Sequence, residues 1–407
     1  MEHTDIAIVG GGIWGASIAF HLAKLGKQDI VLLDRGPLAS ETSSQGAGFL
    51  CSVRHTEALT RLCAESTRFY ARFEEETGHP LDLHLVGGVR IALTARQYEK
   101  LRAEQAVARR LGVVVEELTH RELEHLLPSM AVDKVYGAHI VPLEGYVRFT
   151  RQAALGMAKG AQRAGVRVRS HTPIDALRRA DDGGFLLELP DGPLHAETIV
   201  LAAGAGTGRL ARSMEVTIPA YPIQHQCMVV APRERVPDTM PTVRIPEHDL
   251  YIRHEDGGML LGGVVKSVGP APDAPASALR LAEVEPDREV LKLIQRRSQA
   301  FFPLVGDAFV MWEQRGLPMV SPDLDFVLGE TPSVPRLFVA SGCTLRGVQS
   351  APGVGALLAQ MIVYGETEID ASCWRLDRFG DRYRDPESLY QACRTALGPQ
   401  APSETPA

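Results

Sequence analysis

The sequence predicts a protein of mixed class, in which a Rossmann-type α/β domain is interleaved with an α+β domain built on a mainly antiparallel sheet. Three observations predict it. The first 34 residues read as strand, glycine turn, helix and strand, and a similar α/β pattern returns twice later in the chain. The segments between contain short β-like runs punctuated by proline. At 407 residues, the chain also exceeds what one hydrophobic core usually supports.

The opening unit contains a glycine-rich turn, Gly10-Gly11-Gly12-Ile13-Trp14-Gly15, between an apolar strand and a helix. Gly10 permits a tight turn, Gly12 lets a pyrophosphate approach the backbone, and Gly15 lets the helix pack closely on the strand. The start of the helix adds free N–H groups and a partial positive charge for phosphates. The turn therefore predicts a phosphate cradle.

Asp34 ends the second strand and lies 22 residues beyond Gly12, close to the usual spacing of about 20 for an acid that accepts hydrogen bonds from a ribose. An acid there repels a 2′-phosphate, so NADP is disfavoured. Because both strands, the helix and the acid are in place, a dinucleotide site is favoured over a purely structural turn.

Composition excludes several other classes of protein. The 43 basic and 50 acidic residues give a net charge of −7 and no basic field for nucleic acid. No apolar run approaches the roughly 18 to 20 residues that span a bilayer. The chain opens without a signal-peptide pattern, and six cysteines are scattered without a C-x-x-C pair or histidine at metal-ligand spacing. We therefore expect a cytoplasmic protein with neither disulfides nor a metal site.

The later elements are predicted from hydrophobic periodicity and from end signals. The helix expected at 57–76 has one apolar face and ends before Gly78, and the helix starting at Thr119 carries a capping box with Glu122. Further helices are expected at 95–111, 148–164, about 286–301 and 356–364, strands at 89–93, 166–169, 185–189, 197–201 and 337–340, and a glycine-containing loop at 341–355.

These elements divide the chain into interleaved domains. We assign residues 1–80, 145–215 and 330–397 to the dinucleotide-binding domain, residues 81–144 and 216–329 to the second, substrate-binding domain, and residues 398–407 to a disordered tail.

Several segments, in order along nearly the whole chain, match one family: FEEETG and GGVRIALT in the stretch from Leu59, EGYVR at 144–148, YPIQHQ at 221–226, DLYIRHEDGGMLLGG at 249–263, SGCTLRGVQSAPGVG at 341–355 and LDRFGDRY at 376–383. The chain thus resembles the D-amino-acid oxidase superfamily of FAD enzymes. It is most similar to the flavin domain of dimethylglycine and sarcosine dehydrogenases and oxidases.

The resemblance implies that the dinucleotide is FAD rather than NAD. It places Arg35, Ser43, Ser44 and Gln45 near the ribose and pyrophosphate, Ile174 against the adenine, Ala203 and Gly204 over the dinucleotide, and Gly347, Val348 and Gln349 along the flavin. Relatives often tether FAD to a histidine or a cysteine, but the matching positions here are Gln45 and Leu317 or Pro318. We therefore expect FAD to be bound without a covalent link.

The resemblance also suggests the chemistry. A flavin takes a hydride from a carbon attached to a neutral amine, and the resulting imine is hydrolysed. His225 matches an active-site histidine of the dimethylglycine enzymes, and it suits proton transfer near neutral pH. A histidine hydrogen-bonded within the sheet is the alternative.

A substrate carboxylate needs a fixed cation, for which arginine provides a bidentate fork. Arg54 matches a pocket arginine of the sarcosine oxidases, Arg346 lies in the loop beside the flavin, and Arg253 is a weaker candidate on a strand. Gln349 replaces a carboxylate-binding lysine of some sarcosine oxidases, which argues against sarcosine itself.

Two further departures lie on the strand after residue 257. Val264 stands where the dimethylglycine enzymes carry a catalytic tyrosine, and Leu261 stands near an oxygen-activating lysine of the oxidases, for which Lys266 is the nearby substitute. These changes favour a larger or less polar substrate and a slow reaction with oxygen. Tyr251 and Tyr146 are candidates to line the pocket, with core packing as the alternative.

The sequence therefore predicts FAD-dependent oxidation of the C–N bond of an amino acid or N-alkylated amino acid, with oxygen, an acceptor protein or a quinone as the electron acceptor. One alternative is the flavin subunit of a multi-subunit amino-acid dehydrogenase with a heteromeric partner. Another, of a different class, is a flavin-binding structural subunit without chemistry.

Overall fold

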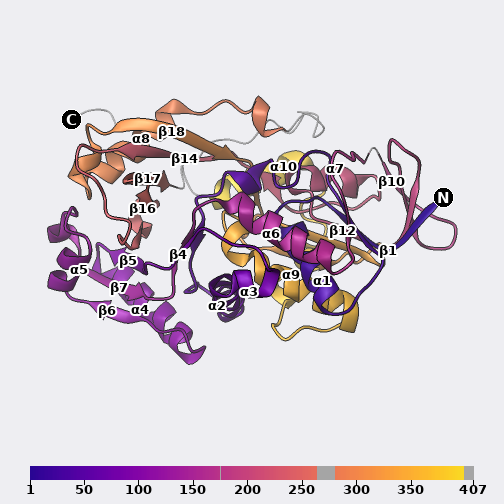
Figure 1. Ribbon diagram of the computed structural model, residues 1–407, viewed down its shortest axis with the longest axis horizontal. Helices are drawn as coiled ribbons and strands as arrows, with labels where there is room; N and C mark the ends of the chain where they lie inside the picture. The colour runs from indigo at the N-terminus through magenta and orange to yellow at the C-terminus, as the bar shows by residue number, and fades with distance from the viewer. Residues whose placement is uncertain (175, 264–279, 398–407) are drawn as a thin grey trace.

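The computed structural model describes residues 1–174, 176–263 and 280–397, arranged as two halves side by side (Figure 1). One half is built on a sheet of eight strands: β1 (Glu2–Val9), β2 (Ile30–Leu33), β9 (Arg167–Arg169), β10 (Leu177–Arg179), β11 (Phe185–Leu187), β12 (Leu194–Leu201), β20 (Val327–Glu330) and β21 (Leu337–Ser341). The strand order is β10-β11-β12-β1-β2-β9, and β21 pairs with both β12 and β20. Pairing of β1 with β2 and β12 is parallel, as in a doubly wound domain.

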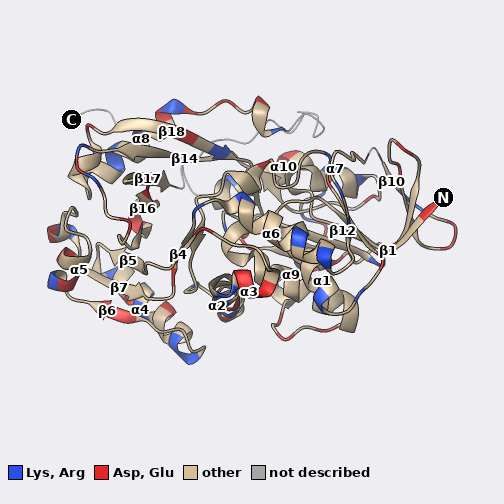
Figure 2. Cartoon of the chain, viewed as in Figure 1, with Lys and Arg blue, Asp and Glu red and all other residues tan. Residues whose placement is uncertain are grey.

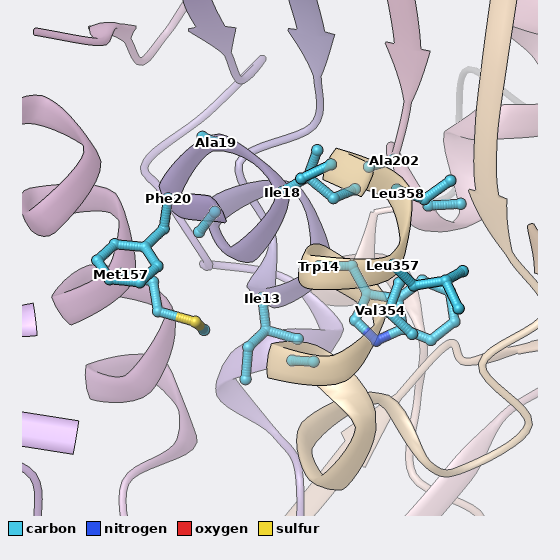
Figure 3. Packing of buried hydrophobic residues seen from close by; sticks show 14 of the residues in the cluster. Ile13, Trp14, Ile18, Ala19, Phe20, Met157, Ala202, Val354, Leu357 and Leu358 are labelled. Atoms are coloured by element: carbon cyan, nitrogen blue, oxygen red, sulfur yellow. The ribbon is translucent and has the colours of Figure 1, made fainter. Parts of the chain in front are cut away.

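Helices cover this sheet, and most of them come from distant parts of the chain. They are α1 (Ile13–Lys24), α2 (Glu57–Ala71), α3 (Phe73–Thr77), α6 (Thr150–Arg163), α7 (Thr207–Arg212), α9 (Gly347–Tyr364) and α10 (Pro386–Ala396). The apolar face of α1 packs between α6 and α9, with Phe20 beside Met157 on one side and Trp14 and Ile18 against the helix of Val354 on the other (Figure 3).

The other half holds a second eight-stranded sheet, in the order β18-β14-β17-β16-β15-β5-β7-β6. Its strands are β5 (Gly88–Ala92), β6 (Glu116–Leu118), β7 (Gly137–Val141), β14 (His225–Ala231), β15 (Thr242–Ile245), β16 (Leu250–Glu255), β17 (Gly258–Gly263) and β18 (Phe309–Gly316). All neighbouring pairs are antiparallel except β15 with β5. Helices α4 (Ala95–Arg110), α5 (His120–Leu126) and α8 (Arg288–Gln299) accompany it. The predicted capping box between Thr119 and Glu122 is present.

Short strands connect the halves. β3 (Phe49–Leu50), β8 (Gly145–Val147) and β4 (Leu83–His84) form one small sheet, and β13 (Tyr221–Pro222) pairs with β19 (Met319–Val320). The division of the chain into domains stays a prediction. Most strands keep to the assigned segments, but β20, which falls largely in segment 216–329, pairs within the first sheet.

The prediction of a loop at 341–355 followed by a helix at 356–364 was wrong, because α9 already begins at Gly347 and contains Pro352. Proline cannot donate to the carbonyl four residues earlier, and that carbonyl, of Val348, accepts instead from the Tyr70 hydroxyl at 2.7 Å. A Cβ on Gly355 would lie 2.2 Å from the Ser17 hydroxyl oxygen. The glycine thus serves close packing of α9 on α1 rather than a turn. The helix expected at 57–76 is also interrupted, at Arg72, into α2 and α3.

Charges of both signs are interspersed over both halves (Figure 2). None of the described helices combines the length and the apolar character needed to cross a bilayer.

Candidate active site

A single cavity of about 960 Å³ runs from the glycine turn of the first half to strands of the second. Ligand pockets usually span about 300 to 1,000 Å³, so this one is at the large end of the range. Most residues predicted for the site line it: Gly10, Gly12, Ile13, Trp14, Asp34, Arg35, Ser43, Gln45, Arg54, Ile174, Ala203, Gly204, His225, Tyr251, Arg346, Gly347, Val348 and Gln349. Gly15, Ser44, Arg253 and Tyr146 do not.

The glycine turn has the geometry of a phosphate cradle. Gly10 has a φ of 110°, in the region that favours glycine, and a Cβ there would lie 2.4 Å from the Ala202 carbonyl oxygen. A Cβ on Gly15 would lie 1.9 Å from the Gly10 carbonyl oxygen, so Gly15 lets α1 pack against the turn. Gly12 is the N-cap of α1 and provides no side-chain cap, although the Ile13 N–H donates to the Ser43 hydroxyl oxygen at 3.0 Å. The helix N-terminus therefore faces the cavity without an acidic side chain in its first turn.

Asp34 is half-buried and organises this turn. Its Oδ2 accepts from the Gly11 N–H at 2.7 Å, and its Oδ1 accepts from the Gly36 N–H at 2.8 Å. Burial raises the pKa of Asp34, while the two backbone hydrogen bonds oppose that rise. Each carboxylate oxygen keeps a second lone pair, so both can still accept a hydroxyl.

The loop from residue 42 to residue 46 forms another wall. The Ser44 hydroxyl donates to the Glu41 carbonyl oxygen at 2.8 Å, which directs it into its own turn rather than into the cavity. The Gln45 amide donates to the Ser44 hydroxyl oxygen at 3.1 Å, and the Leu317 N–H donates to the Thr42 hydroxyl oxygen at 2.9 Å. Gln45, Leu317 and Pro318, which the resemblance matches to the tethering positions, all line the cavity.

The start of α9 is held against α1 and α2. The Trp14 indole donates to the Gly347 carbonyl oxygen at 3.0 Å, and Tyr70 donates to the next carbonyl, of Val348. Gln349, in the first turn of α9, is buried and accepts a hydrogen bond from the Arg54 guanidinium. This arrangement fixes the backbone of Gly347 and Val348 along one side of the cavity.

His225 and Tyr251 form a hydrogen-bonded pair on the sheet of the second half, with His225 Nε2 2.8 Å from the Tyr251 hydroxyl. Burial lowers the pKa of His225 to about 4, so the ring is neutral near pH 7. Burial also raises the pKa of Tyr251, so the phenol keeps its proton and donates it to the imidazole. The structure therefore holds a neutral histidine at the cavity wall.

Two of the three predicted arginines line the cavity. Arg54 is buried and donates to Gln349, while its Nε has no hydrogen-bond partner among the described residues. Arg346 donates to the Leu324 carbonyl oxygen and lies 3.9 Å from Asp325, and its buried Nε is likewise unpartnered in the described part of the chain.

Arg253 points elsewhere. It is fully buried, donates to the Ala47 carbonyl oxygen at 2.8 Å and pairs with Glu255 at 2.6 Å. Its guanidinium lies over the ring of Tyr146, 4.3 Å from the ring centre, so both residues belong to the packing between the halves. Leu261 faces the core of the second sheet, and Val264 and Lys266 lie outside the described residues.

Arg244 on β15 and His55 beside Arg54 also line the cavity, and neither was predicted from the sequence. The apolar residues Val243 and Ile245 are fully buried on either side of Arg244, and this alternation was the available signal that Arg244 faces the other side of the sheet. No motif marked His55, which is brought near Arg346 by the fold.

The cavity fits a dinucleotide such as FAD. It is large, a Cβ at Gly10 would clash with the backbone behind the cradle, and the cavity is also lined by arginines whose buried Nε atoms have no partners in the described chain.

Comparison with known proteins gives matches over nearly the whole chain. Residues 5–361 match a family described as FAD dependent oxidoreductase. The chain is 30% identical to 4-methylaminobutanoate oxidase (formaldehyde-forming) of Paenarthrobacter nicotinovorans, over 97% of this chain and 48% of the relative. It is 28% identical to the mitochondrial pyruvate dehydrogenase phosphatase regulatory subunit of Mus musculus, over 92% of this chain and 43% of the relative. The chain thus spans about half the length of these two relatives.

Glycine oxidase of Geobacillus kaustophilus matches over almost its full length. The sequences are 29% identical over 92% of this chain and 97% of the relative. Its crystal structure has a TM-score of 0.79 and covers 93% of this chain and 99% of that one, at 27% identity.

Proposed function

Because the chain belongs to the FAD-dependent oxidoreductase family, as its sequence motifs predict, we propose that it oxidises the C–N bond of an amino acid or N-alkylated amino acid. FAD supplies the two-electron acceptor for a hydride from the carbon next to the nitrogen, and the imine product is then hydrolysed by water. The chain's own residues bind the cofactor, orient the substrate and keep its nitrogen unprotonated.

One observation carries this proposal: the same cavity joins the glycine cradle and Asp34 to a neutral histidine and to two arginines whose buried Nε atoms have no partner among the described residues. A cavity for a nucleotide alone needs no such group of cations opposite its cradle. An amino acid presents the matching pair, a carboxylate for an arginine fork and an amine whose proton a neutral base can accept.

In this proposal, the amine proton passes to His225 Nε2 through the Tyr251 hydroxyl: the phenol oxygen accepts the amine proton and gives its own proton to Nε2 along their 2.8 Å hydrogen bond. Arg54 and Arg346 face the carboxylate. The Arg54–Gln349 hydrogen bond fixes the guanidinium beside the start of α9, where the resemblance puts the flavin.

The remaining features follow from the residues at the tethering positions and from the cysteines. We infer non-covalent FAD, because Gln45 and Leu317 provide no histidine or cysteine for a link. All six cysteines are unpaired, which favours a reducing cytoplasm. Oxygen, an acceptor protein or a quinone takes the electrons, and the flavin subunit of a multi-subunit dehydrogenase is kept as the alternative.

The test is flavin bleaching in the absence of oxygen. Mixing the FAD-loaded protein with amino acids and N-methyl amino acids should bleach the flavin with at least one of them, and the decarboxylated amine should react about a hundredfold or more slowly, as loss of a charge-assisted pair of roughly 3 kcal/mol implies. Equal rates for an amine and its parent amino acid would redirect the proposal to plain amines.

A second candidate, a flavin-binding regulatory subunit without chemistry, is favoured by the 28% identity to a protein named as a regulatory subunit. No bleaching across the whole amine panel, together with copurification of a partner enzyme, would support this candidate instead.

A further inference from the structure

Arg244 is a partly buried cation of this cavity that can receive an incoming anion. It lies on β15, directly opposite Tyr251 on β16, and lines the cavity. Its Nε is buried without a hydrogen-bond partner, and no hydrogen bond or ion pair joins its guanidinium to any residue in the described part of the chain. The ring of Phe49 lies 5.5 Å from the guanidinium carbon.

An arginine of this kind is unfavourable for stability. Taking a guanidinium out of water has a free-energy cost of several kcal/mol unless hydrogen bonds or an opposite charge compensate for it. Burial, together with the nearby cations Arg54 and Arg90, lowers the pKa of Arg244 to about 10, although Cys51 and Glu144 oppose that shift. A cation–π contact recovers only about 0.5 to 2 kcal/mol of that cost. A group outside the chain is therefore expected to complete this site.

Neighbouring arginines show the contrast. Arg90 pairs with Glu104 at 3.0 Å, and Arg253 pairs with Glu255 at 2.6 Å. Arg54 and Arg346 each donate to a protein oxygen from one edge of the guanidinium. Among the arginines that line the cavity, Arg244 thus has the greatest unused capacity for an anion.

Arg244 also comes from a different wall than the other two. Arg54 follows β3 and Arg346 immediately precedes α9, so both flank the predicted flavin side, while Arg244 belongs to the sheet that carries His225 and Tyr251. Arg54 lies close enough to both Arg244 and Arg346 to lower the pKa of each. A single carboxylate is too small to contact Arg54, Arg346 and Arg244 together.

From this arrangement we infer that the substrate carries two anionic groups, one facing Arg54 and Arg346 and the other facing Arg244, so that it is an amino dicarboxylate with its nitrogen between the two. This inference rests on the proposed amine oxidation for the place of the nitrogen. The prediction that the site binds two anionic groups concerns binding alone, so it can be tested without turnover.

The experiment compares glutarate and pentanoate, two probes that cannot be oxidised because they contain no amine. Pentanoate has a methyl group where glutarate has its second carboxylate. Each is titrated into the FAD-loaded protein, and binding is followed by the flavin absorption spectrum and by the melting temperature. We expect glutarate to bind at least tenfold more tightly than pentanoate. In Arg244→Met that preference should disappear, with pentanoate affinity kept within about twofold.

Two further variants define the controls. Arg54→Met should weaken both probes, and Lys100→Met, which removes an exposed cation from the same cavity wall, should change neither. If Arg244→Met fails to fold, the probe ratio in the unmodified protein and in Arg244→Lys decides instead, with Lys expected to keep part of the preference.

Equal affinity of the unmodified protein for the two probes would overturn the inference, and so would equal weakening of both probes, or loss of FAD, in Arg244→Met. Flavin bleaching tests the proposed function independently. A glutarate preference that depends on Arg244, without bleaching by any amine, would leave the two-anion site standing and remove the reaction.

Discussion

Replacing Asp34 by alanine should loosen the cradle before any ligand is bound. The carboxylate holds the Gly11 and Gly36 N–H groups at 2.7 and 2.8 Å, and alanine leaves both donors without it. A hydrogen bond to a charged group contributes about 1.5 to 3 kcal/mol. Because Asp34 is half-buried and water can replace part of each bond, the lower value applies, and the two together give about 3 kcal/mol.

Two measurements test the loss of these hydrogen bonds, one of stability and one of FAD affinity. Urea unfolding of the FAD-free protein should show a lower free energy of unfolding, by up to about 3 kcal/mol. FAD affinity should fall by roughly 1 to 3 kcal/mol, or about 5- to 150-fold in Kd, since ribose hydroxyls also lose their acceptor. Asp34→Asn should give a smaller change, because its amide keeps one oxygen acceptor but turns a donor toward the other N–H.

Glu41→Gln is the matched control, since Glu41 also lines the cavity but contacts the Leu281 N–H rather than the glycine turn. It should leave FAD affinity within about twofold. An Asp34→Ala protein that retains FAD as the unmodified protein does would refute the reasoning and reduce Asp34 to a strand-end residue.

Four further outcomes are expected. Acid precipitation should release all the flavin into the supernatant because Gln45 cannot form a tether, and flavin remaining in the pellet would contradict this. The pKa of His225 is lowered in the fold, so its contribution to the free energy of unfolding is present above about pH 6.5 and is lost as the pH falls toward 4; His225→Gln should flatten that part of the stability curve and slow flavin reduction. Gly262→Ala should slow flavin reduction as much as Tyr251→Phe with FAD retained, since a Cβ there would lie 2.1 Å from the Tyr251 ring. Arg244→Met should raise the melting temperature of the ligand-free protein, as removal of an uncompensated cation does, and a lower value would show that Arg244 is structural.

The cradle was the most predictable part of the molecule because its signals are local. Gly10, Gly12 and Gly15 have their roles within six residues, and Asp34 follows one helix and one strand later. The structure brings them together through the same short unit, so spacing alone was sufficient.

The start of α9 was missed for the opposite reason. Gly347, Pro352 and Gly353 are signals of a loop when the segment is read alone, but tertiary contacts decide the outcome. The Tyr70 hydroxyl donates to the Val348 carbonyl oxygen, which Pro352 cannot reach with an N–H, and the Gly353 N–H donates to the Ser66 hydroxyl oxygen at 2.9 Å. These partners lie almost 300 positions earlier in the chain, where no sequence pattern connects them to α9.

Arg244 was missed because its meaning depends on pairing across the sheet. A single arginine in a short β-like run reads as a solvated strand residue, and its neighbour Tyr251 becomes evident only from the register of β15 with β16. Arg54 was predicted because it matches a pocket arginine of relatives, and Arg346 because the resemblance puts its loop beside the flavin, although relatives use other polar residues there. Neither kind of signal pointed to Arg244.

The register of three strands explains how the second sheet assembles its part of the site. Arg244 and Tyr251 are directly opposite each other on β15 and β16, and Tyr251 is opposite Gly262 on β17. Because Gly262 has no side chain, the Tyr251 ring lies across β17 and its hydroxyl reaches His225 on β14. One glycine thus lets Tyr251, which lies opposite Arg244, reach His225 on the other side of β17. The distance between His225 and Arg244 is fixed by sheet geometry, at about 4.8 Å per strand, rather than by flexible loops. A site built in this way selects for a substrate whose amine and second anion have a matching separation, which is why the length of the dicarboxylate, and not only its charge, should control binding.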